Sequence, residues 1–98
     1  MKPLGGTRQH FWLAKRMAGQ HALDLAQAMA RGDLDQSDWA KVVQRCRECD
    51  WTGGCRRYLA RGEGAKQAAE KWPGGCPNRA VFATLKAMEE LENTYERQ

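Results

Sequence analysis

Residues 35–49 read DQSDWAKVVQRCREC, and this stretch decides the fold that we predict for the rest of the chain. Asp35 is a good helix N-cap, and Asp38 follows three residues later as the acid of a capping box. Both residues stand directly before an apolar pattern, so the stretch predicts a helix that begins just after Asp35.

The apolar pattern of this helix includes cysteine. Trp39, Val42, Val43 and Cys46 fall at i, i+3, i+4 and i+7, which is the spacing of one buried helix face. Cys49 lies three residues further on and faces nearly the same way. The end of the helix therefore presents two thiols towards the core.

The 98-residue chain has four cysteines, Cys46, Cys49, Cys55 and Cys76, in the spacing C-x2-C-x5-C-x20-C-P. Four thiolates are the full ligand set of a tetrahedral Zn²⁺ or of an iron–sulfur cluster. A close trio with a distant Cys-Pro suits a cluster better than a zinc ribbon, which normally closes with a second C-x2-C. We expect an iron–sulfur cluster, 4Fe–4S, on all four; Zn²⁺, free thiols and disulfides remain open alternatives.

Two glycine pairs directly precede the last two cysteines. Gly53-Gly54 stands before Cys55 and Gly74-Gly75 before Cys76. We expect a tight turn over residues 50–54, and we expect backbone N–H groups at both pairs to approach cluster sulfides. A helix after Cys76, with Pro77 near its first position, would offset the negative charge of the site.

The composition predicts an all-α fold. The chain has no Ile and three Val, whereas helix-forming residues abound. We predict one domain over residues 1–98, a compact bundle of four to five short helices with the four-cysteine site (residues 46–76) at helix ends. Residues 1–6 are expected to be flexible. The other expected helices cover residues 7–29, with a break at 19–21, and residues 55–62 and 65–72. A last helix is expected from about residue 78. Its apolar stripe consists of Val81, Leu85, Met88, Leu91 and Tyr95, with Phe82 beside it.

Several function classes find no support in the sequence. No nucleophile–base pair, phosphate loop or metalloprotease motif occurs, so only a redox role stays open for an enzyme. His10 and His21 are isolated, and we expect them at the surface or partly packed rather than as ligands. The N-terminus lacks the apolar region of a signal peptide and no apolar run is long enough for a membrane span, so a cytoplasmic protein is expected.

The charge is uneven. The net charge is +4, with an acidic C-terminal helix and with arginines around the first three cysteines. These arginines predict a docking surface for an acidic protein partner, or less favourably for nucleic acid; the simpler interpretation is that they offset the charge of the metal site. They are Arg45, Arg47, Arg56, Arg57 and Arg61.

The cysteine frame and its neighbours resemble a known family. The pieces that carry the likeness are GDL at 32–34, Trp39, VQRCREC at 43–49, CRRYL at 55–59 and CPNRAVF at 76–82. They resemble a family of small alphaproteobacterial proteins catalogued only as a domain of unknown function, which implies no activity. A looser likeness, Cys76-Pro77-Asn78-Arg79, is to the cluster frame of bacterial uracil-DNA glycosylases. This chain is too short for that enzyme and lacks its catalytic loops, so the likeness implies cluster ligation alone.

These observations predict a small iron–sulfur protein with a redox or iron- and oxygen-responsive accessory role that acts through a partner. Two alternatives stay open. One is a zinc-stapled protein-interaction module, and the other is a small basic regulator that binds nucleic acid.

Overall fold

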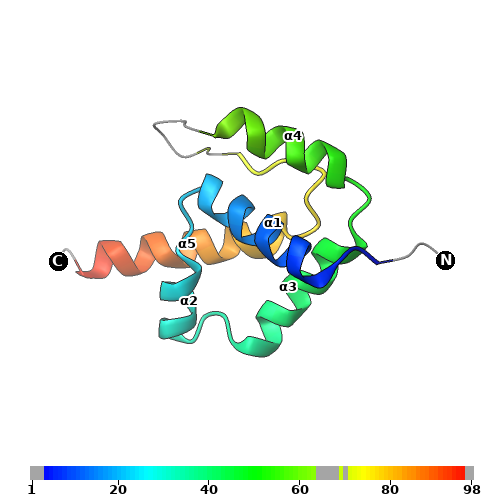
Figure 1. The fold of residues 1–98 in the computed structure, drawn as a ribbon. Coiled ribbons are helices and arrows are strands. Elements are labelled where there is room, and N and C mark those ends of the chain that lie inside the picture. The colour runs from blue at the N-terminus through cyan, green and yellow to red at the C-terminus, as the bar shows by residue number, and fades with distance from the viewer. Residues whose placement is uncertain (1–3, 64–68, 70, 97–98) are drawn as a thin grey trace.

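The computed structural model describes residues 4–63, 69 and 71–96, and these residues form five helices and no strand. The helices are α1 (Thr7–Gln20), α2 (Leu25–Arg31), α3 (Gln36–Glu48), α4 (Thr52–Gly62) and α5 (Arg79–Glu96) (Figure 1). The predicted all-α fold is confirmed. Within the described residues, no helix is both long enough and apolar enough to cross a membrane.

The predicted start of α3 is confirmed in detail. The Asp38 N–H donates to Oδ1 of Asp35 at 2.8 Å, and the Asp35 N–H donates back to Oδ2 of Asp38 at 3.1 Å. This reciprocal pair satisfies two of the N–H groups that a helix start leaves without partners. The preceding helix ends at Gly32, whose φ of 83° is the left-handed conformation that favours glycine.

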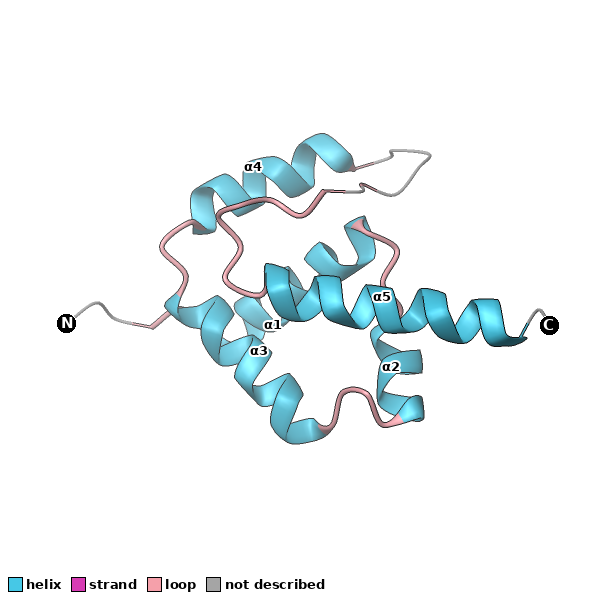
Figure 2. Cartoon of the chain, turned by 180° about the vertical axis from the view of Figure 1, so that it is seen from behind, coloured by secondary structure: helices cyan, strands magenta, loops and turns pink. Residues whose placement is uncertain are grey.

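The core lies where four helices meet. Helix α1 packs against both α3 and α4, and α5 crosses behind them (Figures 1 and 2). The largest side chains with less than 2% exposure come from these helices and from the loop before α3: Phe82, Met17, Leu34, Leu59 and Val42. Helices α1, α3, α4 and α5 thus each contribute one of these side chains to a single small core.

One element start differs from the prediction. Helix α4 begins at Thr52, so the predicted turn over residues 50–54 is confined to residues 50–51 and both glycines lie in the first helical turn. Helix α5 begins at Arg79, within one residue of the predicted start, with Pro77 in the turn before it. The Asn78 side chain packs towards α3, where its amide donates to the Val42 carbonyl at 2.9 Å. Most of the predicted helix over 65–72 lies outside the described residues.

The apolar stripe predicted for α5 is only partly buried. Phe82 and Leu85 are 0% and 4% exposed, whereas Leu91 and Tyr95 are 66% and 79% exposed. The C-terminal half of α5 extends beyond the other helices (Figure 2), and this is the half that carries the exposed Leu91 and Tyr95. The face of α5 that enters the core runs from Phe82 through Leu85 to Glu89.

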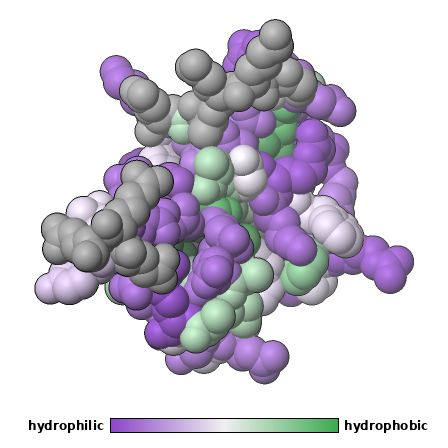
Figure 3. Space-filling model, turned by 90° about the vertical axis from the view of Figure 1, so that its left-hand side faces the viewer, coloured by the Kyte–Doolittle hydropathy of each residue, from purple (hydrophilic) through white to green (hydrophobic). Residues whose placement is uncertain are grey.

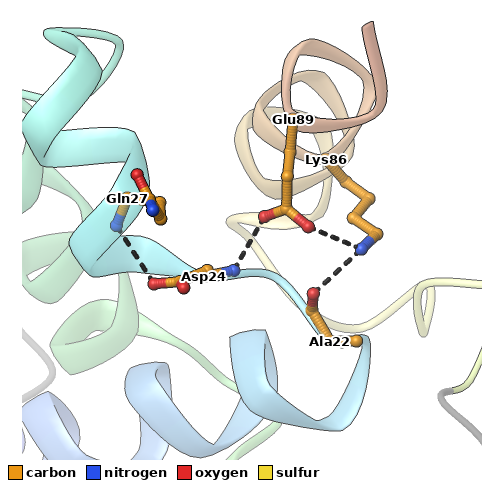
Figure 4. Close-up of polar contacts among 5 residues, drawn as sticks. All are labelled: Ala22, Asp24, Gln27, Lys86 and Glu89. Atoms are coloured by element: carbon orange, nitrogen blue, oxygen red, sulfur yellow. Dashed lines mark hydrogen bonds and ion pairs between the residues drawn. The ribbon is translucent and has the colours of Figure 1, made fainter. Parts of the chain in front are cut away.

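Glu89 ties α5 to the connection between α1 and α2. This carboxylate is 8% exposed; Oε2 accepts from the Asp24 N–H at 2.9 Å and Oε1 accepts from Nζ of Lys86 at 2.9 Å (Figure 4). The same Lys86 ammonium donates to the Ala22 carbonyl at 2.9 Å. Asp24 in turn caps α2 by accepting from the Gln27 N–H at 3.0 Å. Because it accepts hydrogen bonds from two donors, this buried carboxylate does not leave an unsatisfied polar group in the core.

We expect Glu89→Ala to lower the free energy of unfolding by about 1–3 kcal/mol, because the Asp24 N–H loses its acceptor and Lys86 its ion pair. Urea unfolding followed by circular dichroism measures this. The matched control is Glu90→Ala, one residue on and exposed, which should change stability by less than about 0.5 kcal/mol. Equal midpoints for the two variants would contradict a role for the Glu89 carboxylate.

Candidate metal centre

The structure places all four cysteines at helix ends. Cys46 lies in the last turn of α3 and Cys49 at its C-cap; Cys55 lies in the first turn of α4 and Cys76 in the turn before α5. Cys55 and Cys76 are buried and the other two are half-buried. Each of the six possible pairs among these thiols interacts electrostatically. Three separate segments therefore bring their sulfurs to one region.

Burial makes the thiols of Cys46, Cys55 and Cys76 hard to ionise. Burial, followed by the neighbouring Cys55, raises the pKa of Cys46 to about 12. Burial, followed by Cys76, raises the pKa of Cys55 to about 11, and burial also raises the pKa of Cys76. Buried negative charges in one region need a compensating cation. These three thiols are therefore protonated at neutral pH without metal, and metal binding would displace their protons.

Hydrogen-bond donors act in the opposite direction. The Trp51 N–H donates to Sγ of Cys49 at 3.2 Å. The backbone N–H groups of Asn78 and Arg79, together with the Arg79 guanidinium, favour the charged form of Cys76 and lower its pKa against the larger effect of burial. Such N–H donors stabilise a metal-bound thiolate and tune the potential of a cluster.

The present side-chain positions do not form a metal site. Within the described part of the chain, no three His, Cys, Asp or Glu side chains are arranged to hold a metal ion. Sγ of Cys46 instead lies 3.5 Å from Nδ1 of His10, and Sγ of Cys49 lies 3.9 Å from the Gly75 carbonyl oxygen. Four cysteines are residues of the type that zinc or a cluster requires, but their described positions do not form such a site, so metal ligation by them stays a prediction.

His10 is the residue at this site that sequence reasoning missed. It is 4% exposed, so the expectation of a surface or partly packed side chain is wrong. Gly5 covers the ring so closely that a Cβ there would overlap it. The Gly5 N–H donates to the Arg47 carbonyl at 3.1 Å, and Nε of Arg47 donates to the Gly5 carbonyl at 2.8 Å. The glycine pair ahead of α1 was the available signal, since only glycine lets the backbone pass over the ring.

His21 is also buried, at 2% exposure, contrary to the same expectation. Its ring stacks on Trp72 at 3.7 Å between centroids, and its Nε2 lies 2.9 Å from the Tyr58 hydroxyl. Burial lowers the pKa of His21, against a smaller opposite effect of the Ala69 backbone. The neutral ring therefore serves packing, and it holds the segment that leads to Cys76 against α4.

The five arginines divide into two groups. Arg45 donates from Nη1 to Oδ1 of Asn78 at 3.1 Å, and Arg47 binds Gly5, so both half-buried side chains support the fold around the cysteines. The other three are exposed on α4: Arg56, Arg57 and Arg61. Arg16 of α1 and, to a smaller degree, Arg56 lower the pKa of Cys55, though by less than burial raises it.

One glycine of each pair, Gly54 and Gly75, packs closely against the Trp51 side chain. A Cβ on Gly54 would overlap the indole Nε1, and a Cβ on Gly75 would overlap the indole ring at Cδ2. By contrast, nothing lies within 4 Å of a Cβ built on Gly74. The indole thus joins the start of α4 to the segment before Cys76. The approach of backbone N–H groups to cluster sulfides stays a prediction.

We expect Gly75→Ala to destabilise the protein by about 1–3 kcal/mol, because the new methyl group displaces the Trp51 indole. Gly74→Ala is the matched control one residue away and should stay within about 0.5 kcal/mol of the parent. Thermal unfolding measured through tryptophan fluorescence compares the two variants. Equal melting temperatures for both would show that the indole can move aside without cost.

Comparison with known proteins identifies a family without an activity. A family model described as a family of unknown function, DUF6455, matches residues 1–88. No curated protein and no solved structure matches the chain. The match includes the whole cysteine frame and the start of α5. The chain belongs to the family of unknown function DUF6455.

Proposed function

We propose that this protein binds one iron–sulfur cluster, of the 4Fe–4S type, through Cys46, Cys49, Cys55 and Cys76. Its role would be that of a redox or iron- and oxygen-responsive accessory protein. The observation that carries the proposal is the meeting of four thiols, from three segments, in which every pair interacts. Packing alone gives no reason to gather all the cysteines of a chain in one place.

The surroundings of the sulfurs support a charged, metal-bound form. Burial disfavours isolated thiolates here, while the Trp51 N–H and the N–H groups that open α5 point to sulfur. Donors of this kind stabilise thiolates only when a cation offsets the cost of burial. Iron in a cluster would supply that charge, and it would supply the ability to accept or release an electron. The protein residues would bind the cluster, hydrogen-bond to its ligands and exclude water.

We expect anaerobically purified protein to be brown, to absorb near 400 nm, and to contain about four iron and four acid-labile sulfide per chain. Cys→Ser at each of Cys46, Cys49, Cys55 and Cys76 should lower the iron content sharply. Val43→Ala is the control: it lies on α3, three residues before Cys46, is 8% exposed, and weakens packing without removing a ligand. It should keep its iron.

Other outcomes distinguish the alternatives. A colourless protein with one zinc per chain would overturn the cluster and leave a zinc-stapled interaction module. A Cys→Ser variant with full metal content would remove that residue from the site. Protein that takes up neither iron nor zinc during anaerobic reconstitution would show that the four-cysteine site is not a metal centre.

We further propose that an acidic protein partner docks on the exposed arginines of α4. Arg56, Arg57 and Arg61 are exposed on this helix, and Arg56 is electrostatically coupled to Cys55. A partner bound there would lie next to the metal centre. Arginine suits such a surface because its planar guanidinium binds carboxylates through two parallel hydrogen bonds.

We expect Arg56→Glu with Arg57→Glu to abolish salt-sensitive recovery of an acidic partner from cell extracts, with unchanged metal content. The control carries the same charge change on exposed residues of α1, Arg8→Glu with Lys15→Glu, and should retain the partner. Loss of metal instead would assign the arginines to the metal centre. Steeply salt-dependent binding of a DNA or RNA duplex by the parent protein would favour the nucleic-acid regulator.

A further inference from the structure

The projecting half of α5 carries an apolar face that no described residue covers. Met88, Leu91 and Tyr95 are 37%, 66% and 79% exposed, and their 3- and 4-residue spacing places them on one side of the helix. Seen from the end at which α5 projects, the surface is mostly hydrophilic, with separate apolar areas between the polar side chains (Figure 3). An apolar helix face with tyrosine near its end is typical of an interface rather than of a solvated helix.

The same face of α5 continues into a groove of about 380 Å³. One wall is α5 itself, with Val81, Leu85 and Met88; the other wall is α3, with Lys41 and Arg45. Helical spacing puts Val81 and Met88 on the same side as Tyr95, because seven residues make nearly two turns. The groove and the exposed face therefore form one continuous strip along α5.

The two ends of this strip carry opposite charge. Lys41 and Arg45 lie at the groove, whereas Glu92 lies on the projecting half, at the edge of the strip nearest α2, where it lines a second pocket with Glu89 and Arg31. Lys41 and Glu92 form no ion pair with any described residue. The acidic groups at the groove are already engaged: Asp33 pairs with Arg31 at 2.9 Å and Asp38 is part of the α3 capping box. The strip is thus complementary to a copy of itself turned end for end.

We propose that two copies of this chain pair through antiparallel α5 helices, with the end of each α5 lying in the α3–α5 groove of the other. A two-fold axis at Met88 sets Tyr95 of one copy opposite the half-buried Val81 of its partner. Leu91 then lies in the groove at the level of Leu85, which lines the groove but is only 4% exposed. The same register sets Glu92 opposite Thr84, beside Lys41. Such an isologous contact closes at two chains. The pairing uses no cysteine, so it stands independently of the metal centre.

Sedimentation equilibrium of the full chain tests this pairing. We expect a dimer that dissociates when the protein is diluted to micromolar concentrations or below. Its dissociation constant should increase as salt is raised. Lys41→Glu and Glu92→Lys should each weaken it at least about tenfold, because each change sets like charges opposite each other twice. An equimolar mixture of the two variants should restore the dimer, since both contacts are then between opposite charges.

Two further variants test which face is used. Leu91→Asp should give a monomer. Met29→Asp is the control, a 40% exposed apolar residue of a separate patch with Phe11 and Trp39, and it should leave the dimer intact. Dissociation by Met29→Asp alone, a monomer at every concentration up to about 1 mM, or failure of the mixed charge variants to associate would each overturn the proposal.

Discussion

The gathering of two buried and two half-buried thiols where α3, α4 and α5 meet is the constraint on which the rest of this structure depends. A buried thiol is stable while it is protonated, and several thiolates so close together are stable only with a cation. The segments that bring the sulfurs in are held by contacts outside the cysteines: the Trp51 indole between Gly54 and Gly75, the Asn78 amide on the Val42 carbonyl, and the His21 ring on Trp72. These contacts hold in place the segments that carry the thiols.

The parts of the fold that follow from local chemistry could be predicted from the sequence. The capping box of α3, the glycine that ends α2 and the break after α1 all depend on residues within one or two turns of each other. The same holds for the all-α class, which follows from composition. The location of Cys46 and Cys49 at the end of α3 also follows from local spacing, because the apolar stripe and the thiols lie on one helix.

The remaining features depend on contacts between distant residues. His10 is buried because Gly5 crosses over it and binds Arg47, 42 residues away. The glycine pair ahead of α1 indicates a close approach, but local sequence does not identify Arg47 as the partner. Helix α4 begins three residues before Cys55, and the Trp51 indole packs against Gly54 in its first turn. Two adjacent glycines by themselves predict a turn at this position. Periodicity identifies the stripe on α5 as apolar, but it does not show which part of the stripe faces the core of the same chain. Whether the thiols ligate a metal depends on side-chain rotation, which the sequence does not encode locally.

The short connection between α3 and α4 has a consequence for the order in which the chain assembles. Cys46, Cys49 and Cys55 lie within ten residues of sequence, so their sulfurs can meet as soon as these two helices form, with little loss of chain entropy. Cys76 is separated from Cys55 by 20 residues, so its approach to the other three sulfurs costs more chain entropy. Folding should therefore begin with a locally closed α3–α4 unit and end with the docking of α5, which makes the C-terminal helix the late-forming part of the molecule.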